Sequence, residues 1–124
     1  MIKIVFCLRR RADLSREEFQ AYWFTNHAPL VRVHADALGI RRYVQVHSID
    51  DAISTAIAGS RQSPEPFDGV AELWFDSVDA LIAGGSSEAG RAGAAALLED
   101  ERRFIDLERS PLFLAEERVV ISGS

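Results

Sequence analysis

Residues 15–33 read SREEFQAYWFTNHAPLVRV, and this stretch decides the fold. Its apolar side chains recur every three or four residues, which predicts an amphipathic helix lying on a sheet. Ser15 and Glu18 form a capping box that starts the helix. Pro29 has no N–H and clashes with the carbonyl one turn earlier, so the helix should bend or restart there. The predicted apolar face comprises Phe19, Tyr22, Trp23, Asn26, His27, Leu30, Val33 and His34.

Strand-like runs flank this helix on both sides. Residues 2–8 are apolar in both alternating sets, which predicts a strand at the centre of its sheet. Gly39 ends the helix and leads into a second strand over residues 40–47. On this second strand the period of two places three polar side chains on one face: Tyr43, Gln45 and His47.

The rest of the chain repeats this pattern. Residues 69–75 and 112–121 predict two further strands, and Asp76 or Ser77 caps a helix over 78–82. Gly84 and Gly85 should break this helix, which resumes over 88–103. Residues 48–67 are less regular, with a short helical turn over 49–58 and a loop over 59–66, and residues 122–124 should fray.

The order β-α-β-β-α-β predicts an α+β, ferredoxin-like domain spanning residues 1–124. Both helical regions should lie on one face of a four-stranded antiparallel sheet. The opposite face also carries apolar residues and needs a cover. Packing against the sheet of a second copy would bury it, and a twofold dimer is the simplest closed arrangement. We therefore expect a homodimer that forms through the sheet faces.

Composition excludes several classes of partner. The formal charge is -5, from 14 basic and 19 acidic side chains, which disfavours nucleic acid and anionic membranes. No apolar run approaches the roughly 20 residues that span a bilayer. The first residues lack the pattern of a secretion signal, so a cytoplasmic location is expected. The single cysteine, Cys7, cannot form an internal disulfide or a metal-binding cluster.

Three segments carry a resemblance to a known family. FQAYWFTNHAPLV (19–31), GVAELWF (69–75) and FLAEERVV (113–120), in this order, resemble the EthD family of the dimeric α/β-barrel superfamily. The most specific part is Trp23 followed by the His27-Ala28-Pro29-Leu30 run. The stretch DERRF (100–104) also fits the family pattern before the last strand.

The resemblance implies a homodimer with a pocket between the sheet and the helices of each subunit. Family relatives include muconolactone-type isomerases and, more distantly, cyclases and decarboxylases of polyketide anthrones. These relatives act on aromatic or lactone substrates without a metal or an organic cofactor. The resemblance also implies that His27 and Tyr43 are the acid/base groups.

Residue chemistry supports these two candidates and leaves alternatives open. The imidazole of His27 can accept and donate a proton near neutral pH, although it can also cap the restarted helix. The phenol of Tyr43 can donate a hydrogen bond to a developing oxyanion, although a strand tyrosine often only packs. No metal site is expected, because two histidines without a carboxylate partner are a poor ligand set.

Several other side chains are candidates for contact with a substrate. An inward guanidinium of Arg42 would suit a carboxylate or an enolate, and a salt bridge is the alternative. Large apolar side chains can be core residues or pocket walls. His34 can instead stabilise a helix end, and His47 can simply end its strand. The candidates are Phe19, Trp23, Leu30, His34, Arg42, His47 and Trp74.

We therefore expect a small enzyme without a cofactor that binds a hydrophobic, oxygenated ring compound. It would act by acid/base chemistry, as in isomerisation, cyclisation or decarboxylation. A non-catalytic ligand-binding protein, or an accessory protein for an oxygenase or a degradation pathway, is one alternative. A cofactor-free monooxygenase is another. The segment 48–67 would either cover the pocket or pack at the dimer seam.

Overall fold

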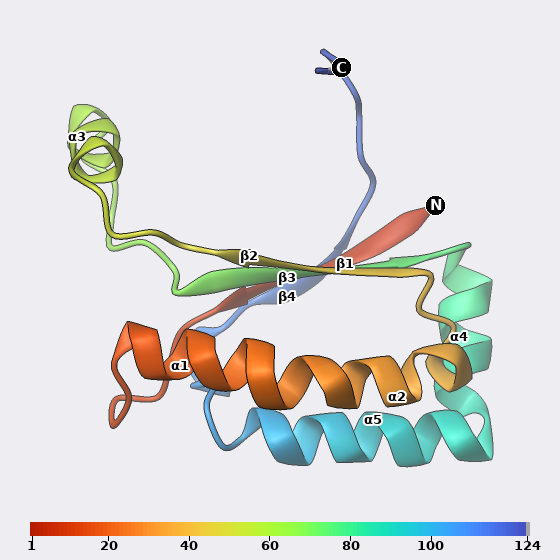
Figure 1. Ribbon diagram of the computed structural model, residues 1–124. Coiled ribbons are helices and arrows are strands. Elements are labelled where there is room, and N and C mark those ends of the chain that lie inside the picture. Colours follow the sequence, from red (N-terminus) through yellow and green to blue (C-terminus); the bar gives the residue numbers. More distant parts are fainter. Residues whose placement is uncertain (124) are drawn as a thin grey trace.

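A four-stranded antiparallel sheet with helices against one face forms the body of the chain, in a computed structural model that describes residues 1–123 (Figure 1). The strand order is β2-β3-β1-β4, which is the ferredoxin-like α+β arrangement, and β1 is central as predicted. The elements are β1 (Ile2–Leu8), α1 (Arg16–Tyr22), a π-helical turn (Trp23–His27), α2 (Ala28–Leu38), β2 (Arg42–His47), α3 (Ala52–Ser60), β3 (Gly69–Phe75), α4 (Val78–Ser86), α5 (Glu88–Glu101), a 3-10 turn (Leu107–Arg109) and β4 (Leu112–Ala115).

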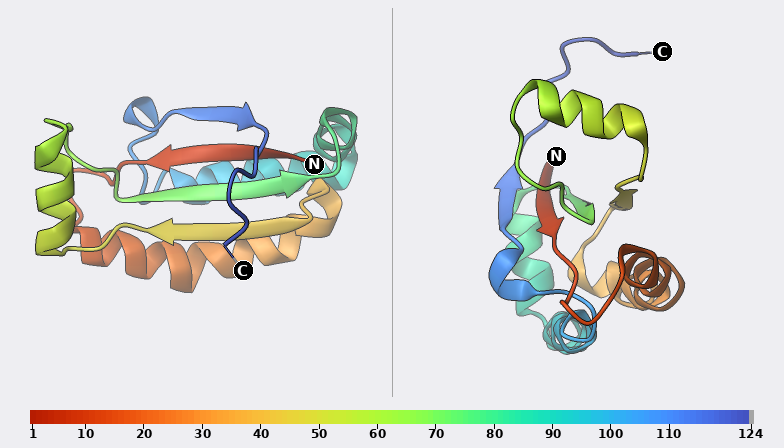
Figure 2. Two further views of the ribbon diagram at one scale, coloured as in Figure 1. Left: turned by 90° about the horizontal axis from the view of Figure 1, so that it is seen from above. Right: turned by 90° about the vertical axis from the view of Figure 1, so that its left-hand side faces the viewer.

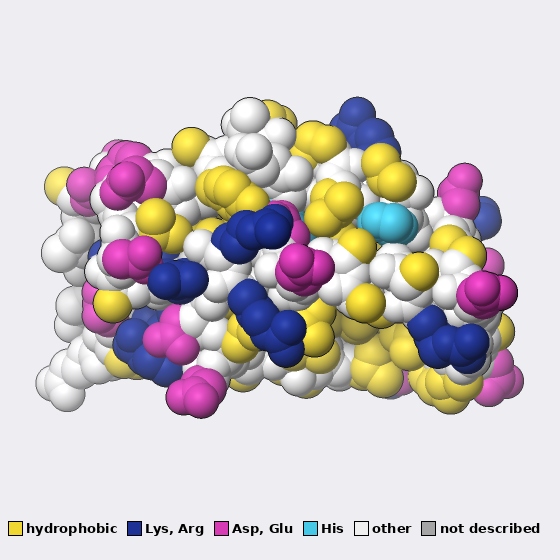
Figure 3. All heavy atoms as spheres, turned by 90° about the horizontal axis from the view of Figure 1, so that it is seen from below, with side chains coloured by type: hydrophobic (Ala, Val, Ile, Leu, Met, Phe, Trp, Pro, Cys, Tyr) yellow, Lys and Arg dark blue, Asp and Glu magenta, His cyan; other side chains and the backbone are white. Residues whose placement is uncertain are grey.

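Two long helical segments form one layer beneath the sheet (Figure 1). α1, the π-helical turn and α2 follow one another as one continuous helical rod. This rod and α5 run side by side beneath the sheet, and α2 packs on α5 (Figures 1 and 2). α4 lies at one end of the sheet, and α3 lies beyond the other end, on the opposite side of the sheet plane (Figure 1). Seen from below, the helical layer carries charged side chains of both signs between its hydrophobic ones (Figure 3). None of the helices within residues 1–123 is long and apolar enough to cross a membrane.

The capping signals lie where the sequence predicts them. The Ser15 hydroxyl accepts from the Glu18 N–H, and the Glu18 carboxylate accepts from the Ser15 N–H. Ser77 caps α4, and Gly39 ends α2 with a φ of 80°, a left-handed conformation that glycine adopts at little cost. These local signals fix the ends of the elements before any long-range packing is considered.

The helical rod contains a π-helical turn just before Pro29. Its buried side chains are spaced by four: Phe19, Trp23, His27 and Val31. On a straight α-helix such a row would drift by about 40° at each step. The π turn, in which Ala28 N–H donates to Trp23 O, corrects this drift and keeps the row on the sheet. The predicted face is therefore partly wrong, because Val33 is 73% exposed and Val31 is buried instead.

Three other boundaries differ from the prediction. α4 continues through Gly84 and Gly85 to Ser86. A Cβ at Gly84 would overlap the carbonyl oxygen of Leu38. The glycine therefore permits close packing of α4 on the end of α2 and does not break the helix. β4 ends at Ala115, after pairing with β1 over four residues, so the predicted strand over 112–121 is too long. The irregular segment contains a nine-residue helix, α3.

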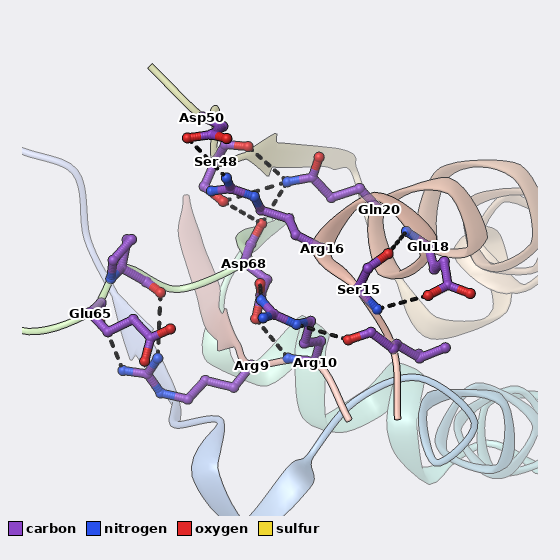
Figure 4. A network of polar contacts seen from close by, with 12 residues as sticks. Arg9, Arg10, Ser15, Arg16, Glu18, Gln20, Ser48, Asp50, Glu65 and Asp68 are labelled. Atoms are coloured by element: carbon purple, nitrogen blue, oxygen red, sulfur yellow. Dashed lines mark hydrogen bonds and ion pairs between the residues drawn. The ribbon is translucent and has the colours of Figure 1, made fainter. Parts of the chain in front are cut away.

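A polar network joins the start of α1 to the chain before β3 (Figure 4). The buried carboxylate of Asp68 accepts hydrogen bonds from the Arg10 backbone N–H and guanidinium. The Gln20 amide donates to the carbonyl oxygens of Ser48 (2.8 Å) and Asp68 (2.9 Å). The network therefore fixes both ends of the segment that carries α3.

The face of the sheet away from the helices has no helical cover within residues 1–123 (Figures 1 and 2). Lys3 and Glu72 form an ion pair of 2.8 Å on it, and the Trp74 indole N–H donates to Glu117 of the C-terminal segment. The chain exposes 8282 Å², whereas a compact monomer of 13.7 kDa exposes about 6,600 Å². The described chain thus exposes about 1,700 Å² more than its mass requires.

Candidate functional site

An apolar cavity of about 330 Å³ lies between the sheet and the helices. Strand residues such as Phe6 and Leu73 form its roof, and Val31 and Leu97 from α2 and α5 form its floor. This volume lies at the small end of the range for ligand sites, which suits a compact ligand. Almost all lining side chains are hydrocarbons, and the ionisable ones are His27, Tyr43 and Glu101.

His27 lies in the π turn and is only 5% exposed. Its Nδ1 lies 2.7 Å from Oδ2 of Asp100, which is also buried and belongs to α5. Because a carboxylate only accepts, Nδ1–H is the donor in this pair. Within residues 1–123, Nε2 has no hydrogen-bond partner, so its lone pair is free, and His27 is one of the residues that line the cavity.

Two further donors orient the Asp100 carboxylate. The Tyr22 hydroxyl donates to Oδ1 at 2.5 Å, and the Arg103 guanidinium donates to the same oxygen at 3.1 Å. Burial alone would raise the pKa of Asp100, but the hydrogen bonds from Tyr22, His27 and Arg103 lower it below its ordinary value. Asp100 is therefore ionised at neutral pH and selects the Nδ1–H tautomer of His27.

Burial also lowers the pKa of His27, although the hydrogen bond and the charge of Asp100 oppose this effect. The imidazole is consequently neutral at neutral pH. A neutral ring with Nδ1–H fixed and Nε2 free is the state that a general base requires. The dyad thus presents a proton acceptor to an apolar space.

Tyr43 lies on β2, and a neighbouring amide fixes its hydroxyl. Gln45 Nε2 donates to Trp23 O at 3.0 Å and to the Tyr43 hydroxyl oxygen at 2.9 Å, while Gln45 Oε1 accepts from His47 Nε2 at 2.8 Å. A carbonyl can only accept, so the contact with Trp23 O establishes which end of the amide is the NH₂ group. The phenol proton is therefore left for a ligand oxygen. Burial raises the pKa of Tyr43, which keeps that proton in place.

Glu101, at the end of α5, is the third ionisable group of the cavity. Burial and the adjacent charge of Asp100 raise its pKa from 4.5 to about 7, against the opposing effect of Arg102. A carboxyl with this pKa can give or take a proton at neutral pH. Sequence reasoning missed Asp100 and Glu101 as site residues. Their spacing after Leu97, three and four residues along one helix, is the signal that places them on its apolar face.

The structure places the other candidate residues in three environments. Trp23 lines the cavity and stacks on His47 with ring centroids 4.6 Å apart, and His47 reaches the site through Gln45. Phe19 and Leu30 belong to the core, and His34 lies against Gly93 of α5. Arg42 lies over the Trp74 ring, 4.8 Å from its centroid, on the opposite face of the sheet from the cavity. Among the described residues, no group of three or more His, Cys, Asp or Glu side chains could bind a metal ion.

Comparisons with known proteins agree with this architecture. The model of the EthD domain matches residues 11–108. A crystal structure of an ethyl tert-butyl ether D (EthD) family protein from Bacillus halodurans superposes with a TM-score of 0.62 at 19% identity, covering 95% of this chain and 99% of that one. None of the curated proteins compared with the chain matches it significantly.

Two other solved structures share the fold. One is described as a dimeric protein of unknown function with a ferredoxin-like fold, from Bacteroides fragilis, with a TM-score of 0.58, 11% identity, and coverage of 94% of this chain and 95% of that one. The other is SnoaB, a cofactor-independent oxygenase from Streptomyces nogalater, with a TM-score of 0.55, 16% identity, and coverage of 98% and 96%. At these identities the likeness concerns the fold.

Proposed function

The chain belongs to the EthD family, and from this premise we propose that it is a cofactor-independent enzyme that moves protons on a hydrophobic, oxygenated ring compound. The observation that carries the proposal is the buried His27–Asp100 pair, in which Nε2 is free and His27 lines an apolar cavity. Tyr43 and Glu101 add a hydrogen-bond donor and a second proton carrier to the same cavity. A hydrocarbon wall excludes water and strengthens these polar interactions.

The arrangement suits proton transfer next to a carbonyl. His27 Nε2 takes a proton from the carbon beside the carbonyl, and the electrons of that C–H bond move to the carbonyl oxygen. The Tyr43 hydroxyl donates a hydrogen bond to the resulting enolate oxygen. Return of a proton from imidazolium or from neutral Glu101 to a different carbon completes an isomerisation. Cyclisation and decarboxylation pass through enolates of the same kind.

A cofactor-free oxygenase is the second candidate, favoured by the fold that the chain shares with SnoaB. In that case His27 would deprotonate an electron-rich phenol, and the phenolate would react with dioxygen. Oxygen consumption on addition of 1-naphthol, measured with an electrode, distinguishes this reaction from proton transfer. A third possibility, binding without turnover, gives ligand-induced NMR shifts and no product.

We also propose that the protein is a homodimer joined through the outer face of the sheet. Val46 and Phe113 on this face are about half exposed. The neighbour from Bacteroides fragilis, described as dimeric with a ferredoxin-like fold, supports the proposal of a dimer.

Hydrogen–deuterium exchange tests the proposed chemistry without knowledge of the natural substrate. 2-Tetralone, a bicyclic ketone, is incubated with the protein in D₂O, and loss of the signal of the protons beside the carbonyl is followed by ¹H NMR. The wild type should exchange these protons faster than buffer, and His27→Gln should lose about 100-fold of this rate. Asn26→Gln, an exposed neighbour in the same turn, is the matched control. Exchange in a folded His27→Gln variant at the wild-type rate would remove this residue from the mechanism.

A further inference from the structure

A second cavity, of about 390 Å³, lies where the helical rod passes the edge strand β2. Tyr43, Gln45 and His47 line it from the strand. Phe24, Ala28 and Arg32 line it from the rod, at successive spacings of four along one side. The cavity is therefore built from one row of a strand and one row of a helix, both fixed by the main fold.

The second cavity shares Tyr43 with the inner cavity. The two spaces meet at this ring, and the amide of Gln45 determines where the ring hydroxyl lies. A molecule in the second cavity therefore lies beside the residue whose hydroxyl we assign as hydrogen-bond donor for the reaction. Its own recognition also depends on residues that do not line the inner cavity, chiefly Phe24 and Arg32 on the rod.

Arg32 is the cation of this cavity, and it is unpaired. Most arginine side chains in the described chain contact a carboxylate, a carbonyl, a hydroxyl or an aromatic ring, whereas Arg32 forms no hydrogen bond or ion pair within residues 1–123. None of the residues that line the cavity is acidic. On a protein with a net charge of -5, this fork of donors is a local site for a planar anion.

Phe24 supplies the apolar side of the cavity. It is 66% exposed, although its neighbour Trp23 is almost fully buried. Its ring meets the His47 ring edge-on, with centroids 6.1 Å apart and an interplanar angle of 78°. An exposed aromatic ring beside an unpaired guanidinium matches a flat ring that bears a carboxylate.

We propose that the second cavity is a binding site for an aromatic carboxylate, with the carboxylate on Arg32 and the ring against Phe24 and His47. The assignment does not depend on the proton chemistry of the inner cavity. It makes Arg32 a specificity-determining residue for anions and Phe24 the residue that selects aromatic ones. Binding at this site would reach the inner cavity through Tyr43.

The test is an NMR titration of the full-length protein with 1-naphthoate, with its uncharged analogue 1-naphthamide and with acetate. 1-Naphthoate should bind most tightly, and its contacts should appear at the Phe24 ring and the Ala28 methyl. Arg32→Gln should weaken 1-naphthoate about fivefold and leave 1-naphthamide unchanged, while Arg32→Lys should retain part of the affinity. Phe24→Ala should weaken both aromatic probes. Arg61→Gln, which removes an exposed arginine that lines neither cavity, is the control.

The proposal is overturned by the absence of 1-naphthoate binding to the wild type, by equal affinity for 1-naphthoate in wild type and Arg32→Gln, or by contacts confined to Ala94 and Leu97 of the inner cavity. Tighter binding of acetate than of 1-naphthoate would also contradict it, because the ring would then contribute nothing. Loss of exchange activity in His27→Gln with unchanged 1-naphthoate binding separates this site from the proposed reaction.

Discussion

Nδ1 of His27 lies 2.7 Å from Oδ2 of Asp100, and the two residues are 73 positions apart in the chain. The pair joins the π turn of the helical rod to the end of α5, so it forms only when both elements pack beneath the sheet. The site is thus assembled by the fold as a whole. Its chemistry should respond to changes at Asp100 that leave the imidazole in place.

Asp100→Asn should uncouple the ring from its anchor. The amide no longer carries the negative charge that selects Nδ1–H, so the ¹⁵N NMR shifts of His27 should show a changed tautomer ratio. Exchange of 2-tetralone protons should fall about 10- to 100-fold, the range found for carboxylates that orient metal-bound imidazoles. Glu99→Gln, an exposed carboxylate next in sequence, should change neither measurement. An unchanged tautomer ratio in Asp100→Asn would contradict the assigned role.

Glu101→Gln should make the protein more stable at high pH. The pKa of Glu101 is raised in the folded state from 4.5 to about 7, so the wild-type carboxyl contributes fully to stability below pH 4.5. This contribution is lost as the pH rises through about 7, and the shift corresponds to about 3 kcal/mol. Between pH 4 and pH 8, the free energy of unfolding of Glu101→Gln should therefore rise relative to that of the wild type by about this amount. Urea denaturation at both pH values measures it, and a constant difference would rule out the raised pKa.

The adjacent glycines of α4 should respond oppositely to alanine. A Cβ at Gly84 overlaps the carbonyl oxygen of Leu38, so Gly84→Ala should lower the free energy of unfolding by about 1–3 kcal/mol. A Cβ at Gly85 has no atom within 4 Å, so Gly85→Ala should raise it by about 0.5–1 kcal/mol. Thermal and urea denaturation of the two variants check this pair. Equal effects would show that α4 does not pack on the end of α2.

Phe113→Glu should dissociate the proposed dimer. Phe113 lies on the outer face of β4, paired with Val5 of β1, and a charge there would be buried without a partner in a sheet-to-sheet interface. Val33→Glu makes the same change at an exposed site on α2 and should leave the dimer intact. Sedimentation equilibrium reports the mass of each variant. A monomeric wild type would contradict the proposed assembly directly.

Local signals in the sequence predict most of the fold. The capping box at Ser15, the cap at Ser77, the turn at Gly39 and the strand over 69–75 lie where their patterns place them. The end of β4 and the continuation of α4 through its glycines differ. Both depend on which residues meet across the fold, and periodicity within one segment carries no such information.

The same limit applies to the candidate site. Alternation along β2 predicts that Tyr43, Gln45 and His47 share a face, and the helical pattern places His27 on the inner side of the rod. The pairing of His27 with Asp100 joins distant segments and does not follow from spacing. Asp100 and Glu101 nevertheless follow Leu97 within an apolar helical face, and acidic residues on such a face are candidates for a functional site.

The π turn also constrains how this chain can vary in length. Removing one residue between positions 23 and 27 would leave 11 residues from Phe19 to Val31, and these make three α-helical turns to within about 20°. Both side chains could then still face the strands, so a single-codon deletion here should convert the π turn into ordinary α-helix and still allow folding. Exchanges at the exposed positions Thr25 and Asn26 should also be tolerated. The segment can therefore lose one residue over evolutionary time, whereas a further inserted residue would rotate α2 by about 100° and turn Val31 away from the sheet.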